Sequence, residues 1–117
     1  MIYHITSRAS WNEACQRGDY RADSLEIEGF IHCSTEEQVV QVAENFFKGQ
    51  SDLYLLVIEP TLLASDLKWE PPSDGPPPGI PEDDLFPHIY GPINLDAVVQ
   101  VFDLQSDPDG KFSFPEI

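Results

Sequence analysis

The chain has 117 residues, of which 6 are Lys or Arg and 21 are Asp or Glu, so its formal net charge is −15. This length predicts one domain over residues 1–117 that can bury a core without disulfides or metal, and a hydrophobic content of 41% excludes a wholly disordered chain. No apolar run approaches the ~20 residues of a membrane span, and the N-terminal residues do not resemble a secretory signal.

The acidic charge also bears on partners. Binding a nucleic-acid backbone or an anionic membrane needs clustered basic residues, and the six here are scattered, so neither partner is expected. Solubility or adaptation to a saline cytoplasm explains the net charge of −15, and a cationic partner is the alternative explanation. A small anionic ligand stays compatible, because one Arg and a few backbone N–H groups can hold it.

The first elements are a strand and a helix. Residues 2–6 predict a short strand. Ser7 is placed to cap a helix over residues 8–17, and Gly18 ends that helix.

Two cysteines stand outside any CxxC pair. Cys15 falls on the apolar side of the first helix, with Trp11 and Ala14, and Cys33 lies in a strand over residues 30–33. Both are expected to be small buried hydrophobic residues, which fits a reducing cytoplasm. Adjacent strand residues face opposite ways, so Cys33 is not expected to act as a nucleophile paired with His32.

A second helix follows the strand at 30–33, whereas residues 20–28 are ambiguous and alternate as an extended segment would. Ser34 to Glu37 form a capping box, with Ser34 as the N-cap and Glu37 reaching back to its N–H. One apolar stripe is expected in the core, made of Val39, Val40, Ala43, Phe46 and Phe47.

Strands dominate the second half. Residues 53–58 predict a strand covered on both faces, and the remaining segments predict short strands at 67–70, 97–104 and 111–114, with a helical turn at 61–65. Residues 71–87 hold seven prolines and two glycines, which predicts a long loop able to cover a site rather than a helix or a central strand. Early helices and later strands, without regular β-α alternation, predict an α+β domain with a mixed or split β-sheet and two helices.

All three histidines lie in apolar, strand-like segments. Each shares a strand face with a hydroxyl-bearing residue two positions on: His4 with Thr6, His32 with Ser34 and His88 with Tyr90. Strand ends that bring these groups together, under the proline-rich loop, would form a ligand-binding cleft.

Other interpretations of these residues stay open. Each histidine alone could be a hydrogen-bonded structural residue. A three-histidine zinc site is chemically reasonable, but no close pair such as HxH supports it, and no metal is predicted. The N-terminus of the helix after Ser34 could hold an anion beside His32, although Glu36 and Glu37 oppose this. Arg8 and Arg21 could lie near the same cleft or be solvated surface residues.

Four motifs carry a resemblance. Tyr3-His4-Ile5-Thr6, Gly29 to Ser34, Trp69-Glu70 and Pro87 to Gly91 resemble the bacterial domain-of-unknown-function family 952, which is grouped with ADP-ribosyltransferase-like folds. This resemblance implies an ADP-ribosyltransferase-like fold and NAD as a candidate cofactor. It also implies that His4 holds a ribose hydroxyl and that His32 positions a ribose or phosphate. In the superfamily a third motif supplies a Glu or Gln that orients the ribose, and Glu70 and Tyr90 are the candidates for this position.

Two functional hypotheses follow. The first is a cytoplasmic, non-catalytic module that binds a small ligand or a protein on a degenerate ADP-ribosyltransferase-like fold. It is favoured because Ile5 stands where the similar first-strand motif of the ADP-ribosyltransferase-like superfamily, Tyr-His-Gly-Thr, has the glycine that lets a nucleotide approach the backbone. The alternative is a transferase or hydrolase acting on NAD or a related nucleotide, in which Glu70 stabilises positive charge at the anomeric carbon.

Overall fold

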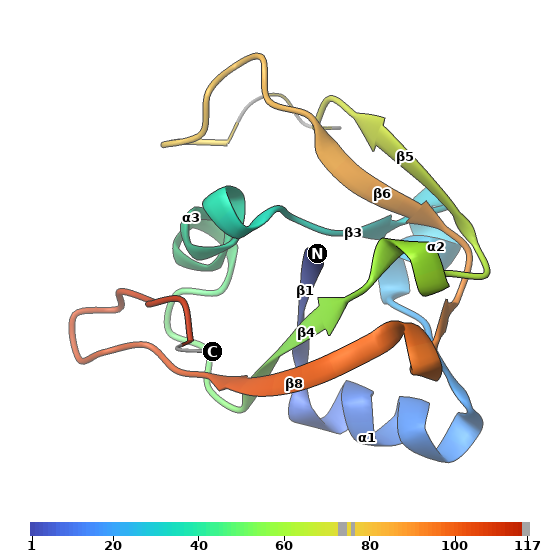
Figure 1. Ribbon diagram of the computed structural model, residues 1–117. Helices are drawn as coiled ribbons and strands as arrows, with labels where there is room; N and C mark the ends of the chain where they lie inside the picture. Colours follow the sequence, from blue (N-terminus) through green and yellow to red (C-terminus); the bar gives the residue numbers. More distant parts are fainter. Residues whose placement is uncertain (73–74, 76, 116–117) are drawn as a thin grey trace.

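A three-stranded antiparallel sheet forms the middle of the protein (Figure 1). The computed structural model describes residues 1–72, 75 and 77–115. In this sheet β4 (Leu53–Ile58) is central and pairs with β1 (Ile2–Ser7) on one side and β8 (Val98–Leu104) on the other. The strands predicted at 2–6, 53–58 and 97–104 are therefore confirmed.

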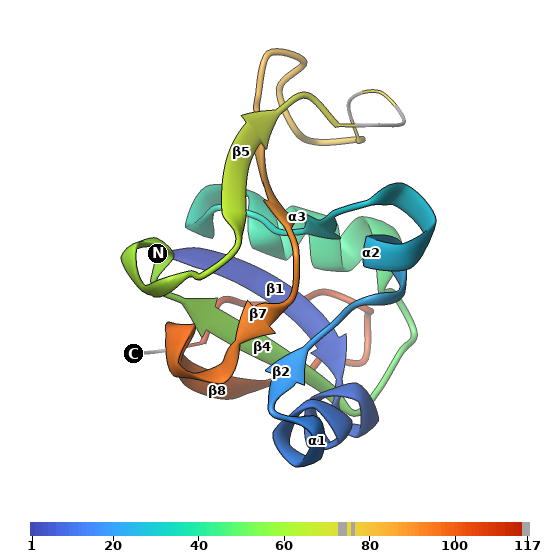
Figure 2. The same cartoon turned by 90° about the vertical axis from the view of Figure 1, so that its right-hand side faces the viewer.

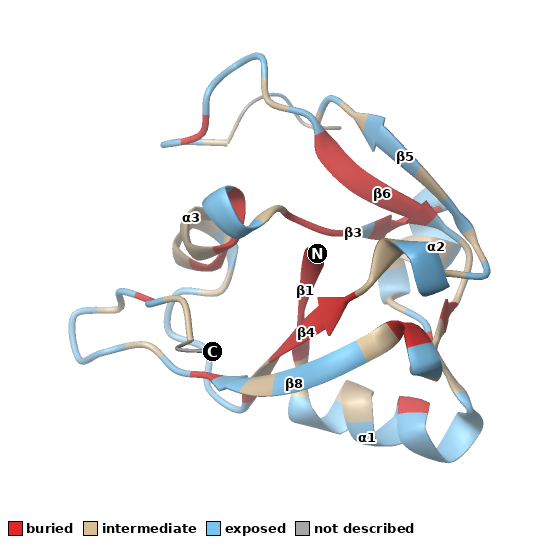
Figure 3. Ribbon diagram, in the orientation of Figure 1, coloured by how far each residue is buried: buried red, intermediate tan, exposed pale blue. Residues whose placement is uncertain are grey.

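The six residues of β4 are apolar because both faces of this strand are covered. Leu53, Leu55 and Val57 pack into one hydrophobic cluster, and Leu56 and Ile58 pack into a second cluster on the opposite face. Figure 3 shows β1 and β4 almost wholly buried, whereas the edge strand β8 is mainly exposed.

Helices α1 (Arg8–Arg17) and α3 (Glu36–Phe46) lie on opposite faces of this sheet. α1 begins and ends as its sequence predicts. The Ser7 side chain accepts a hydrogen bond from the Ser10 N–H, and Gly18 takes a left-handed φ of 106° at the C-terminus. None of the helices within the described ranges is long and apolar enough to cross a membrane.

A second antiparallel sheet lies beside the first and carries two of the three histidines. Its middle strand is β6 (Phe86–Tyr90), flanked by β3 (Ile31–His32) and β5 (Asp66–Glu70), which confirms the strand predicted at 67–70. The remaining short elements, seen best in Figure 2, are β2 (Asp19–Tyr20), β7 (Ile93–Asn94), α2 (Asp23–Glu28) and the 3₁₀ turns η1 (Pro60–Leu62) and η2 (Leu95–Ala97).

One residue pair joins the two larger sheets. Tyr3 and Ser34 exchange both backbone hydrogen bonds, at 2.9 and 2.8 Å, just beyond the end of β3. Because of this link, β1 and the β3–β6 ladder lie next to each other. The imidazole of His4 can therefore reach the backbone of residue 32.

The expected fold needs two corrections. The domain is α+β as predicted, but its described residues form three α-helices rather than two, because residues 23–28 form α2 rather than an extended segment. Gly29 at φ 90° ends this short helix, and its N–H bonds back to the Ser24 and Leu25 carbonyls. The described strands form three sheets and every pairing between them is antiparallel, so the split sheet is confirmed and the mixed alternative is wrong.

The start of α3 was predicted one residue too early. Thr35 is the N-cap, and its capping box closes with Gln38 rather than with Glu37. Ser34 cannot take this role because its backbone is committed to Tyr3. Cys15 was also misplaced: it is exposed on α1, whereas Cys33 is buried as expected.

Pro87 lies in a central strand, where a proline was not expected. Its carbonyl accepts a hydrogen bond from the Cys33 N–H at 3.1 Å, so this side of Pro87 faces the β3 side of the sheet. β3 itself ends at His32. The missing N–H of Pro87 therefore removes only the second hydrogen bond of the last residue pair in this ladder, which limits the cost of a proline inside a sheet.

Candidate functional site

The structure divides the predicted histidine cluster into a buried group and a group at a cavity. His4 belongs to the buried group and is 8% exposed. Its Nδ1 lies 2.5 Å from the carbonyl oxygen of His32, and its Nε2 lies 2.8 Å from the hydroxyl of Tyr20, which is itself 2.9 Å from Thr6 Oγ1. His4 and Thr6 share a face, as the alternation predicts, and both face Tyr20.

Burial determines the protonation of His4. Desolvation lowers its pKa from 6.5 to about 4, so the ring is neutral at physiological pH. A carbonyl only accepts hydrogen bonds, so the single ring proton sits on Nδ1 and Nε2 must accept from the Tyr20 hydroxyl. The Thr6 hydroxyl then donates to the Tyr20 oxygen. Burial also raises the pKa of Tyr20 to about 12, which keeps the phenol protonated.

Tyr20 is a residue that sequence reasoning missed. It lies in the two-residue strand β2 and is 3% exposed. Its hydroxyl occupies the position at which a ligand hydroxyl would otherwise meet His4 and Thr6. The only sequence signal was an aromatic residue directly after the Gly18-Asp19 turn, which does not indicate a polar contact.

The second group is organised around Glu70. His88 Nδ1 lies 2.9 Å from Glu70 Oε1, and the Tyr90 hydroxyl donates to the same oxygen at 2.5 Å. Hydrogen bonds from Tyr90 and then His88 hold the pKa of the Glu70 carboxyl below its usual value, so it is ionised. The same contact raises the pKa of Tyr90. The structure thus brings together three of the residues singled out from the sequence.

His32 lies directly opposite His88 on the neighbouring strand. The two ring centroids are 5.5 Å apart, and Phe30 stacks on His88 at 4.1 Å with an interplanar angle of 21°. His32 Nε2 contacts Glu28 Oε2 at 2.8 Å. Each of these imidazoles therefore has a carboxylate at one of its nitrogens.

A cavity of about 340 Å³ opens beside this histidine pair. β3, β6, α3 and the proline-rich loop all contribute to its wall, and most of the lining side chains are apolar. The lining residues are His32, Cys33, Ser34, Val42, Phe46, Phe47, Pro72, Gly75, Pro77, Phe86 and His88. His32, Ser34 and His88 thus share one cavity, whereas His4 is not among its lining residues, so the expectation that His4 and His32 face one cleft was wrong.

Phe46 explains the apolar character of the cavity. The sequence pattern placed Phe46 in the core, but it is 60% exposed, whereas Val39 and Ala43 of the same stripe are fully buried. Phe46 is the last residue of α3, and it lines the cavity, whereas the next residue, Phe47, packs against the core cluster of this face.

The proline-rich loop is attached to α3 by side-chain amides. Asn45 Nδ2 donates to the Pro78 carbonyl at 2.8 Å, and Gln38 Nε2 donates to the Leu85 carbonyl at 2.9 Å and to Asp84 at 3.2 Å. Three described residues of the loop, Pro72, Gly75 and Pro77, line the cavity, as the expected cover would require. Residues 73, 74 and 76 of that cover lie outside the described residues.

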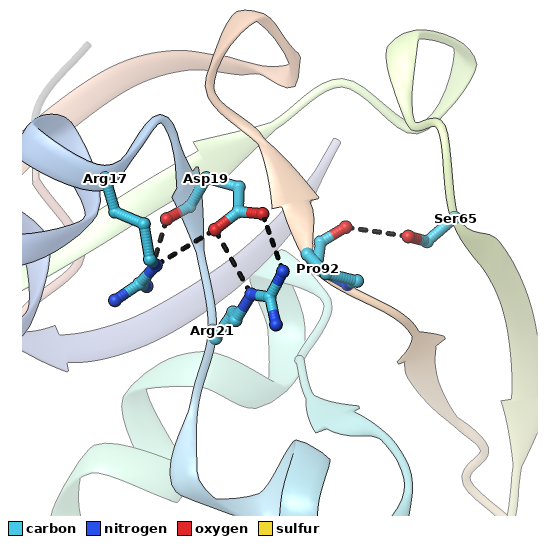
Figure 4. A network of polar contacts seen from close by, with 5 residues as sticks. All are labelled: Arg17, Asp19, Arg21, Ser65 and Pro92. Atoms are coloured by element: carbon cyan, nitrogen blue, oxygen red, sulfur yellow. Dashed lines mark hydrogen bonds and ion pairs between the residues drawn. The ribbon is translucent and has the colours of Figure 1, made fainter.

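The anion sites considered from the sequence lack free cationic groups. Arg8 pairs with Asp103 at 3.0 Å. Arg17 and Arg21 both pair with Asp19, at 3.0 and 3.2 Å, which lowers the pKa of that carboxyl (Figure 4). The capping box occupies the first turn of α3, which also carries two glutamates. Within the described residues, no group of three or more His, Cys, Asp or Glu side chains is arranged to hold a metal.

Comparison with known proteins gives a family and a fold. The family described as Protein of unknown function (DUF952) matches residues 5–101. A crystal structure of protein CC0527 from Caulobacter crescentus is 37% identical and has a TM-score of 0.81, with 96% of this chain and 92% of that chain covered. Its solution NMR structure is 38% identical, has a TM-score of 0.73, and covers 94% and 89%. No curated protein matches the chain.

Proposed function

Because the chain belongs to the DUF952 family, whose function is unknown, we propose a function from the cavity itself: a non-catalytic module that binds a small, largely apolar ligand. The ligand would lie between α3 and β6, with its apolar part against Phe46, Phe47 and Phe86. His32, Ser34 and His88 would supply its polar contacts. Mostly apolar walls with a few convergent polar groups are typical of small-molecule sites.

The exposure of Phe46 carries this proposal. A large aromatic side chain that is 60% exposed on a helix loses favourable burial, and here it borders a cavity with two further phenylalanines. A ligand in the cavity would restore this burial, at roughly 25 cal/mol for each Å² of apolar surface covered. Exposed apolar patches that surround a hollow commonly mark binding sites.

The resemblance to ADP-ribosyltransferase-like proteins suggests the second candidate, a transferase or hydrolase acting on NAD. In that scheme His4 would hold a ribose hydroxyl. Both nitrogens of His4 already have partners inside the protein, and a nucleotide would have to displace Tyr20. The cavity also lacks Lys and Arg among its described lining residues, which a diphosphate would need. These observations favour the binding module on a degenerate fold.

A fragment screen followed by amide ¹H–¹⁵N NMR tests the proposal. The library contains apolar fragments together with NAD, ADP-ribose and inorganic phosphate. We expect apolar fragments to shift the amides of α3 and β6. Phe46→Ala should weaken their binding by about fivefold or more, because it removes on the order of 1 kcal/mol of apolar contact.

Ile27→Ala is the matched control, because Ile27 is 81% exposed on α2 and does not line the cavity. It should leave the affinity of the fragments unchanged. An equal loss of fragment affinity in both variants, or the absence of chemical-shift changes at the amides of α3 and β6, would contradict the proposed binding site. Binding of NAD or ADP-ribose with shifts around His4 would instead favour the second candidate.

A further inference from the structure

The ring of His88 is held on three sides. Glu70 accepts a hydrogen bond from Nδ1, Phe30 stacks on one face, and His32 lies across the strand pair. The residue is only 2% exposed, yet it lines the cavity. Glu70 is in turn fixed by the Tyr90 hydroxyl. The orientation of the ring is therefore set before any ligand arrives.

This arrangement determines which nitrogen meets a ligand. When the His88 ring carries a single proton, the ionised Glu70 carboxylate keeps this proton on Nδ1, because a carboxylate only accepts hydrogen bonds. The two nitrogens of an imidazole point to roughly opposite sides of the ring, so Nε2 points away from Glu70. A carboxylate on one nitrogen also makes the other a stronger acceptor. Among the described residues Nε2 has no hydrogen-bond partner, so it can accept from a ligand.

The charges around the cavity favour a cation over an anion. Glu70 and Glu28 lie directly behind the two imidazoles. The described lining residues include no Lys or Arg, and the arginines nearest in sequence are already paired with Asp19 (Figure 4). The ammonium of Lys68 lies 4.9 Å over the Tyr90 ring and helps to lower the pKa of Glu70, so it offsets part of this attraction for a cation from outside the described cavity lining. A net charge of −15 adds a long-range attraction for positive ligands.

We propose that the cavity binds a small hydrophobic amine whose ammonium group donates a hydrogen bond to His88 Nε2 while its apolar body packs against Phe46, Phe47 and Phe86. This inference rests on the proposed ligand-binding function and names its ligand class. The phenylalanine rings add cation–π attraction, which offsets part of the cost of removing the ammonium from water. Glu70 acts as a positioning residue, because it reaches the ligand only through His88.

Three probes of matched shape test this class: 2-phenylethylamine, 2-phenylethanol and 3-phenylpropanoate. They share a phenyl ring and a short chain, and they differ in a cationic, neutral or anionic head. Dissociation constants come from NMR titration of the full chain at pH 7 and low salt. We expect the amine to bind about tenfold more tightly than the alcohol, which is the order expected for a charge-assisted hydrogen bond, and the carboxylate to bind more weakly than both.

Glu70→Gln separates a positioning role from a structural one. It removes the charge behind His88 and should reduce the preference for amine over alcohol to about threefold or less. Glu13→Gln is the control, because it alters net charge equally from an exposed position on α1. It should keep the full preference.

The two proposals fail in different ways. If none of the probes binds, or if all bind equally well to Phe46→Ala, the cavity is not a ligand site and the proposed function falls with it. If the probes bind in a Phe46-dependent manner but the alcohol or the carboxylate equals the amine, the cavity stands and the amine inference is overturned. An unchanged amine preference in Glu70→Gln removes Glu70 and His88 from recognition.

Discussion

His88 and Glu70 form a hydrogen-bonded pair across β5 and β6, with Nδ1 of the imidazole 2.9 Å from Oε1 of the carboxylate. The residues that lie directly opposite in the ladder are Lys68 and His88, so Glu70 contacts His88 diagonally, from two positions farther along the same face. This diagonal places the carboxylate beside the imidazole without filling the cavity. Tyr90, two residues along β6, donates to the same oxygen.

Tyr90→Phe should raise the pKa of the Glu70 carboxyl towards its ordinary value of 4.5, because the Tyr90 hydrogen bond is the largest cause of its depression. Carbon-13 NMR of the glutamate carboxyl groups across an acid titration measures this change. Tyr54→Phe is the control, because Tyr54 lies on β4 in the other sheet. An identical titration of Glu70 in wild type and Tyr90→Phe would show that the short contact does not stabilise the carboxylate.

The stability of the protein should fall in acid because of His4. Its pKa is about 4 when folded and returns to about 6.5 when unfolded, so between these values the unfolded chain binds a proton that the folded chain does not. Stability contributed by the neutral ring is present above pH 6.5 and is lost as the pH falls towards 4. The total loss is up to about 3 kcal/mol.

His4→Gln isolates this contribution, because an amide can donate to the His32 carbonyl and accept from Tyr20 without titrating. Urea unfolding of both proteins from pH 7 to pH 4 gives the difference, and carboxylate titrations common to both proteins cancel. The free energy of unfolding of wild type should decrease relative to the variant over this range. Parallel pH profiles would show that His4 is not held neutral.

Most of the long elements could be predicted from local patterns. The continuous apolar run of β4 and the capping and terminating residues of α1 each encode their structure within a few positions. α2 escaped prediction because six residues give less than two turns of periodicity, and the alternation of Leu25 and Ile27 imitates a strand. The start of α3 was missed by one residue because the backbone of Ser34 is used in a long-range bridge.

The site was predictable only where its residues share a strand face. Alternation correctly placed His88 with Tyr90 and His4 with Thr6, because side chains two residues apart on a strand point to the same face of the sheet. It could not show which strands become neighbours, so it did not separate His4 from His32. Tyr20 reaches His4 through a tertiary contact across 16 residues, which leaves no local signal.

Two substitutions should separate core burial from cavity lining. Leu55 is fully buried in β4, so Leu55→Ala should lower the free energy of unfolding by about 3 kcal/mol. Phe46 is mostly exposed, so Phe46→Ala should cost less than about 1 kcal/mol despite removing a larger side chain. Chemical denaturation measures both values. A cost for Phe46→Ala as large as that for Leu55→Ala would return Phe46 to the core.

Gly91 is required by the close approach of Ser65 at the end of the β5–β6 ladder. A Cβ at residue 91 would overlap Ser65 Oγ and would lie 2.8 Å from Ser65 Cβ. The Ser65 hydroxyl is fixed there by donating to the Pro92 carbonyl at 2.7 Å (Figure 4). The chain therefore cannot accept a side chain at residue 91 unless Ser65 moves and this hydrogen bond breaks.

Gly91→Ala should lower the free energy of unfolding by about 1–3 kcal/mol, the range for overpacking a tight contact. In a Ser65→Gly background the side chain that causes the clash is gone, so adding Gly91→Ala should cost less than about 0.5 kcal/mol. Urea denaturation of wild type, both single variants and the double variant gives the coupling between the two sites. Additive effects of the two substitutions would show that the clash with Ser65 does not determine the need for glycine at residue 91.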